Sequence, residues 1–128
     1  MIVLYNSPVV DKLAFKLVSD LKQMGEQVWF SLHEVTHPDN LEIENEEALR
    51  NADTVLFIAS RESVSSSELL DKLKYSMQQN KMVILLYAEA CTFPFSVSKL
   101  EAIDLSEDYY NGFTILKNVL QFQDEDSN

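Results

Sequence analysis

Short apolar runs of strand length alternate along the chain with segments whose apolar residues recur every three or four positions. The first pattern, rich in β-branched and aromatic residues, predicts strands, and the second predicts amphipathic helices. The predicted strands are residues 2–5, 27–31, 54–59, 82–88 and 102–105. Strict alternation of strands and helices indicates right-handed crossovers and a central parallel sheet with helices on both faces.

The first two predicted helices have recognisable ends. Ser7 before Pro8 predicts an N-cap with proline at the first helical position, and the helix stops at Gly25. A second helix is expected over residues 41–51, where Asp39 or Asn40 can cap it.

The other two helices begin at serines. In the third, Ser65 and Glu68 have the spacing of a capping box, in which serine accepts from the N3 amide and glutamate reaches back to the cap. The last helix is expected to begin at Ser106.

The run at residues 54–59 is apolar at every position after Thr54, so we expect it to be buried on both faces in the middle of the sheet. Five strands favour a flavodoxin-like three-layer sandwich with strand order 2-1-3-4-5. In that order a crevice forms between the carboxyl ends of the first and third strands. Tyr5, Asn6 and Ser7 would line one side of it, and residues 60–68 the other.

Length and charge narrow the classes of partner. The 128 residues suit a single domain, taken as residues 1–122, with an acidic tail at 123–128 that we expect to fray. The net charge is −11, from 21 acidic and 10 basic residues, which disfavours nucleic acid and anionic lipid as partners.

With one cysteine, no signal peptide and no apolar run of membrane-spanning length, the protein is expected in the cytoplasm.

Several familiar sites are disfavoured. His33 and His37 match the zinc motif H-E-x-x-H, but a predicted strand lies just upstream and Pro38 follows, whereas the motif needs a helix. We therefore expect a surface loop and no metal site. The chain also lacks G-x-G-x-x-G, a P-loop and the acidic pair of receiver domains.

Glu68 has two interpretations. It can serve the capping box, or it can be a carboxylate at the mouth of the crevice that stabilises a cationic transition state or orients a sugar hydroxyl. Tyr5 and Trp29, near strand ends, are either core aromatics or walls against which a base stacks.

The order of these parts resembles a TIR (Toll/interleukin-1 receptor) domain, in particular the small bacterial kind, over nearly the whole chain up to about Leu120. The resemblance is carried by residues 2–5 with Asp11, Leu17 and Leu21; by residues 25–29; by residues 47–53 before the strand that ends in Ser60; by Ser66; and by Pro94, residues 103–105 and residues 109–112. It implies one of two roles. One is association with other TIR domains or with itself in signalling or defence, with a nucleotide as a further ligand; the other is cleavage of NAD.

In enzymatic members of this family a glutamate in the third helix contacts the nicotinamide ribose. Here that position falls on Lys72, which would repel a cationic nicotinamide and an oxocarbenium-like transition state. Glu68 lies one helical turn earlier on the same face, where it could replace the missing carboxylate or pair with Lys72. No cofactor is required, and NAD would be substrate or ligand. Beside Glu68 and Lys72, the residues expected to contact it are Tyr5 and Trp29 as aromatic walls, and Asn6, Ser60 and Ser66 as polar contacts.

Overall fold

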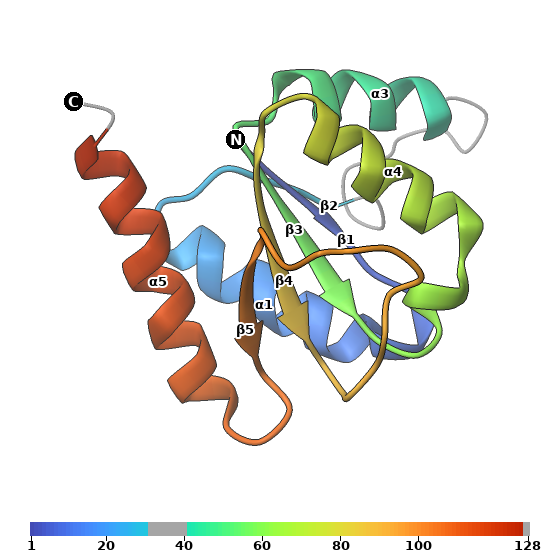
Figure 1. The fold of residues 1–128 in the computed structure, drawn as a ribbon. Helices are drawn as coiled ribbons and strands as arrows, with labels where there is room; N and C mark the ends of the chain where they lie inside the picture. Colours follow the sequence, from blue (N-terminus) through green and yellow to red (C-terminus); the bar gives the residue numbers. More distant parts are fainter. Residues whose placement is uncertain (31–40, 127–128) are drawn as a thin grey trace.

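The computed structural model describes residues 1–30 and 41–126, and the side chains of 1–30 and 46–121. Within these residues the chain forms a five-stranded sheet in the order β2-β1-β3-β4-β5, with every neighbouring pair parallel. The strands are β1 (Ile2–Tyr5), β2 (Val28–Phe30), β3 (Thr54–Ala59), β4 (Met82–Tyr87) and β5 (Glu101–Asp104). The predicted flavodoxin-like architecture and strand order are confirmed (Figure 1).

Helices cover both faces of the sheet. They are α1 (Asp11–Gln23), α3 (Leu41–Asn51), α4 (Ser67–Gln78) and α5 (Tyr109–Asp126). Figure 1 shows α3 and α4 on one side of the strands and α1 and α5 on the other. In the part of the chain that the structure describes, no helix is both long and apolar enough to cross a membrane.

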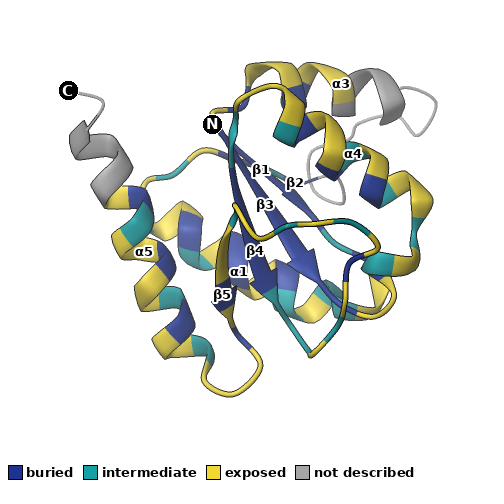
Figure 2. Ribbon diagram, in the orientation of Figure 1, coloured by how far each residue is buried: buried dark blue, intermediate teal, exposed yellow. Residues whose placement is uncertain are grey.

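Two apolar cores separate these layers, because successive side chains of a strand point to opposite faces. Leu4 and Leu56 belong to the core under α1 and α5, whereas Tyr5 and Phe57 belong to the core under α3 and α4. All six residues of β3 are buried, as its apolar run predicts (Figure 2). Tyr5 pairs in register with Phe57, which places the end of β1 beside the end of β3.

The first helix differs from its prediction at the N-terminus. A 3₁₀ turn, η1 (Pro8–Val10), precedes α1, and the Ser7 side chain caps neither. Ser7 Oγ instead lies 3.3 Å from Ser60 Oγ, buried between β1 and β3. Ser7 thus occupies the N-cap position of η1 with Pro8 directly after it, as predicted, but its side chain makes no capping hydrogen bond.

The third helix is capped one residue later than predicted. Ser63–Ser65 form a 3₁₀ turn, η3, and Ser65 Oγ donates to the Arg61 carbonyl at 3.0 Å. Ser66 is the N-cap, and its Oγ accepts from Leu69 N at 3.2 Å. Glu68 is then the second residue of α4 rather than the third, so the predicted capping box does not form.

The last helix begins at Tyr109, not at Ser106. Asp104 Oδ1 accepts from both the backbone N and Oγ of Ser106, at 2.8 and 2.6 Å, and holds that residue in a turn. Asp108 Oδ1 accepts from Asn111 N at 3.1 Å, in the manner of an N-cap. The helix runs to Asp126, four residues beyond the predicted end of the domain. The predicted helix 41–51 is confirmed, and its candidate caps Asp39 and Asn40 lie outside the described residues.

Candidate functional site

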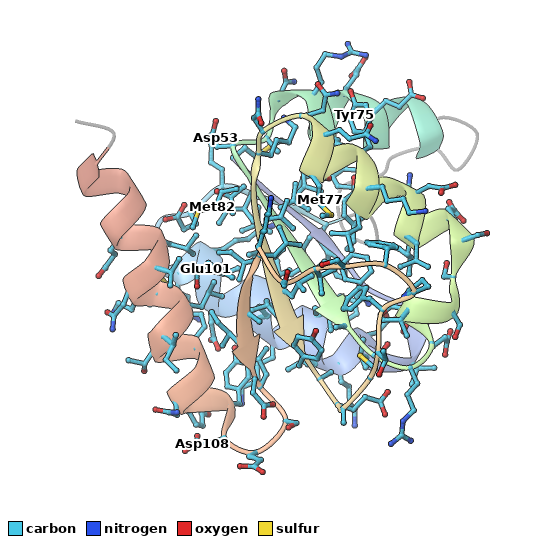
Figure 3. The ribbon with its side chains drawn as sticks, in the orientation of Figure 1. Asp53, Tyr75, Met77, Met82, Glu101 and Asp108 are labelled. Carbon is cyan, nitrogen blue, oxygen red and sulfur yellow. The ribbon has the colours of Figure 1, made fainter. Side chains whose placement is uncertain are left out.

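A pocket of about 360 Å³ lies between α3 and α4 above the end of β1. Both helices contribute one face to it, and Tyr75, labelled in Figure 3, marks the α4 side. The lining residues are Tyr5 from β1; Glu46, Leu49 and Arg50 from α3; and Glu68, Asp71, Lys72 and Tyr75 from α4. The structure therefore brings together three of the predicted site residues, Tyr5, Glu68 and Lys72.

Tyr5 forms the inner end of this pocket. Its side chain is buried, with 5% of the residue exposed, and its hydroxyl has no hydrogen-bond partner among the described residues. Burial disfavours the charged phenolate and raises the pKa of Tyr5 to about 12. Tyr5 therefore presents a neutral O–H donor that lacks an acceptor.

Lys72 and Glu68 face the same space but do not pair. The Lys72 ammonium lies 5.8 Å from the centre of the Tyr5 ring, within the range of a cation–π contact. Within the described part of the chain neither side chain forms an ion pair. Of the two alternatives for Glu68 beside Lys72, the structure thus shows an unpaired carboxylate rather than a salt bridge.

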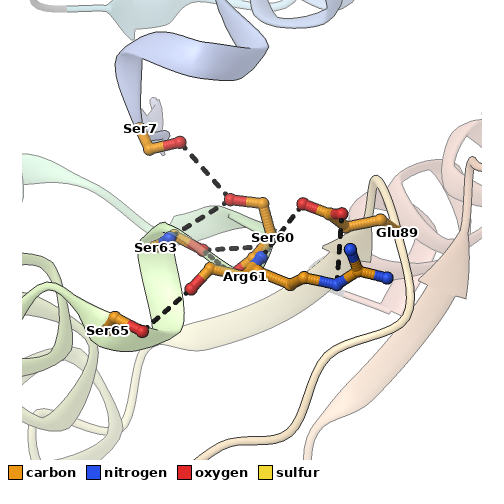
Figure 4. Close-up of polar contacts among 6 residues, drawn as sticks. All are labelled: Ser7, Ser60, Arg61, Ser63, Ser65 and Glu89. Carbon is orange, nitrogen blue, oxygen red and sulfur yellow. Dashed lines mark hydrogen bonds and ion pairs between the residues drawn. The ribbon is translucent and has the colours of Figure 1, made fainter.

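Ser60 and its neighbours close the turn after β3 (Figure 4). Ser60 N donates to Ser63 Oγ at 2.8 Å, Ser63 N donates to Ser60 Oγ at 3.1 Å, and Ser63 Oγ donates to the Ser60 carbonyl at 3.1 Å. Both serines are fully buried. Ser60 is also within 3.3 Å of Ser7, so this cluster fastens the end of β1 to the turn that leads into α4.

A second contact holds the outer side of this turn. Arg61 N donates to Glu89 Oε2 at 3.1 Å, and Arg61 Nε lies 3.6 Å from Glu89 Oε1. Glu89 follows β4, so the turn is tied to strand ends on both sides. The serine turn therefore positions α4, but none of its residues lines the pocket, whose lining comes from β1, α3 and α4.

The other predicted contacts also lie outside the pocket lining. Asn6 Nδ2 donates to the Ser7 carbonyl and to Asp11 Oδ1, both at 2.8 Å, which joins β1 to α1. Ser66 is committed to its cap. Trp29 is half-buried on β2, in register with Val3, and packs against the core under α3 and α4.

Sequence reasoning missed Glu46, Arg50, Asp71 and Tyr75. A signal was present, because residues 68, 71, 72 and 75 have the spacing of one helical face, and residues 46, 49 and 50 have it too. These polar faces resembled ordinary solvated surfaces. Only the packing of α3 beside α4 makes them face a shared space.

The expectation of no metal site concerned the H-E-x-x-H motif at residues 33–37. His33 and His37 are outside the described residues. Among the residues that are described, no three histidine, cysteine or carboxylate side chains are grouped to hold a metal ion.

A doubly wound parallel sheet with a pocket at the carboxyl end of its first strand defines a class of flavodoxin-like domains. Within this class, the sequence matches the TIR domain family over residues 2–117, and the chain belongs to that family. In structure it is similar to the TIR domain of the Toll-related receptor TRR-2 from Hydra magnipapillata, with a TM-score of 0.79, 16% identity and 94% of each chain covered. That likeness shows the fold. No curated protein matches the sequence.

Proposed function

We propose that this TIR domain acts by association with other TIR domains, either a second copy of itself or a partner, in signalling or defence. Family membership supports association in general. Lys72 is the observation that favours association over chemistry. It stands on the pocket face of α4, where the resemblance leads us to expect a carboxylate.

The physical reason is the sign of the charge. Cleavage of a nicotinamide glycosidic bond builds positive charge on the sugar, and a catalyst must bind that charge more tightly than the substrate. The Lys72 ammonium, which lies near the Tyr5 ring, would repel that positive charge. The positive charge at this position therefore favours a role in association between domains, which does not require cleavage of NAD.

Light scattering coupled to size-exclusion chromatography over a concentration series, with and without NAD, tests the proposal. The expected result is a mass that rises with concentration. A strict monomer at every concentration, alone and when mixed with other TIR domains, would contradict it.

Cleavage of NAD is the second candidate, and Glu68 is the observation that favours it. Glu68 lines the same pocket one turn before Lys72 and carries no ion pair within the described residues. It lies in the first turn of α4, where the helix dipole favours a negative charge. In this arrangement Glu68 would be the carboxylate that faces the ribose.

Nicotinamide release, followed by chromatography at protein concentrations high enough for association, tests this candidate. Glu68→Gln should abolish release, whereas Glu47→Gln, which changes an exposed carboxylate outside the pocket lining, should not. Absence of release from the wild type, or equal release from Glu68→Gln, would rule out Glu68 as the catalytic group.

A further inference from the structure

We propose that Tyr110 is a phosphorylation site, where the phosphate pairs with the Lys16 ammonium and fastens α5 to α1. The phosphoryl donor is a nucleoside triphosphate, and the reaction is that of a tyrosine kinase. The phenol oxygen of Tyr110 attacks the γ-phosphorus, the bond from that phosphorus to the leaving nucleoside diphosphate breaks, and the phenol proton passes to the kinase's base. This inference goes beyond association between domains and does not depend on it.

Tyr110 is the most exposed of the chain's five tyrosines. Its surface is 70% accessible, compared with 44% for Tyr75. Tyr5 is buried, and Tyr87 and Tyr109 are half-buried. A hydroxyl must enter the active site of another enzyme to be phosphorylated, so exposure alone already favours Tyr110.

The residues before Tyr110 form an exposed acidic approach. Glu107 and Asp108 are both exposed and lie in the loop that leads from β5 into α5 (Figure 2). Such charges complement a kinase whose substrate groove is basic. Tyr110 itself lies in the first turn of α5, where amides have few partners within the helix, and Gly112 lowers the helix propensity of that turn. This turn can therefore open into a kinase site without disturbing the sheet.

The Lys16 ammonium lies where a phosphate on Tyr110 would need a cation. Lys16 Nζ donates to Tyr110 Oη at 3.3 Å and lies 4.5 Å from the centre of the Tyr110 ring. A phosphate would add a charge of about −1.5 to −2 and three acceptor oxygens. The contact with Lys16 would then become a charge-assisted hydrogen bond between two helices, and the first turn of α5 also favours a negative charge.

The neighbouring Tyr109 has the opposite surroundings. Its hydroxyl donates to Asp20 Oδ2 at 2.6 Å. Burial, and then the hydrogen bond to Asp20, raise the pKa of Tyr109, so its phenol keeps its proton. A phosphate there would lie against the Asp20 carboxylate and be repelled. Helix α1 thus presents a cation to Tyr110 and an anion to Tyr109, which makes the two tyrosines a matched site and control.

Labelling of the full chain with ATP and a broad-specificity tyrosine kinase tests the site, and tandem mass spectrometry locates the phosphate. Tyr110 should be labelled at least about tenfold faster than Tyr109. It should also be labelled faster than Tyr75, which is exposed but follows Lys74 within α4 rather than an acidic loop. Tyr110→Phe should remove most of the label. No label on Tyr110, or a rate no higher than that of Tyr109 or Tyr75, would overturn the inference.

Thermal unfolding of the phosphorylated chain tests the contact with Lys16. Its Tm should lie roughly 2–4 °C above that of the unmodified chain, because the new pair joins α5 to α1. Lys16→Met should abolish this rise. Lys74→Met should keep it, because Lys74 belongs to α4 on the other side of the sheet, with its ammonium 4.9 Å from the centre of the Phe95 ring (Figure 1).

Comparing phosphorylated with unmodified protein within each variant cancels the effect of the substitution itself on stability. An unchanged or lowered Tm on phosphorylation, or the same rise in Lys16→Met as in the wild type, would refute the pairing of the phosphate with Lys16.

Discussion

Replacing Tyr5 by phenylalanine should make the protein more stable. The change removes a buried hydroxyl that has no partner among the described residues and keeps the ring in the core under α3 and α4. A buried polar group without a hydrogen bond costs about 1–3 kcal/mol. Most substitutions in a protein core lower the free energy of unfolding, so an increase would be unusual.

The gain is reduced by the space that the oxygen leaves. At about 24 cal/mol per Å³ of cavity, a void of roughly 15 Å³ costs about 0.4 kcal/mol. The free energy of unfolding of Tyr5→Phe should therefore rise by about 1 kcal/mol or more, and Tm by roughly 4 °C for a domain of this size.

Urea unfolding followed by the fluorescence of Trp29, the single tryptophan, measures this difference. The midpoint should rise with an unchanged denaturant slope. Tyr75→Phe is the matched control, because Tyr75 lines the same pocket with 44% of the residue exposed and should change stability by less than about 0.5 kcal/mol. A loss of 1 kcal/mol or more in Tyr5→Phe, with Tyr75→Phe neutral, would show that the hydroxyl makes a stabilising contact.

Three further predictions concern stability. Ser60→Ala should cost about 1–3 kcal/mol, because Ser63 N loses its buried acceptor, whereas Ser65→Ala at the exposed end of the turn should cost less in the same urea assay. Gly112→Ala should destabilise although alanine favours helices by about 1 kcal/mol, since its Cβ would meet the Asp104 carbonyl oxygen at 2.8 Å; a rise in Tm would refute that clash. Burial raises the pKa of Tyr5 above the value of about 10 in the unfolded chain, so the unfolded state releases its proton first and stability should fall from about pH 10 to 12. Tyr5→Phe should lose less stability over this range, and equal losses would contradict the shift.

Local patterns predicted the strands well, because each is decided by short-range features. The run after Thr54 has no polar side chain to place in water, so it can only be a central buried strand, and the structure buries it completely. The alternation of strands and helices then leaves few topologies, because crossovers are right-handed and connections are short.

Helix starts were predicted less well, because neighbouring hydroxyls and carboxylates compete for the same amides. Ser7 stands at the N-cap position before Pro8, but its side chain makes no capping hydrogen bond, and folding places its hydroxyl beside that of Ser60. Ser65 and Ser66 both have the chemistry of a cap, and the 3₁₀ turn held by Ser63 and Ser60 selects Ser66. Such choices depend on residues more than 50 positions apart or on turn geometry, which periodicity does not encode.

The sequence by itself thus determined the sheet, its order and the region in which a site could form, since burial and periodicity are local properties. Only the tertiary structure decided which side chains share the site. It turned the polar faces of α3 and α4 toward one pocket and brought Lys72 near the Tyr5 ring. It committed Ser60, Ser66 and Asn6 to structural hydrogen bonds. Which polar groups stay free is settled by packing between distant elements, because a donor or acceptor is available to a ligand only where the fold leaves it unpaired.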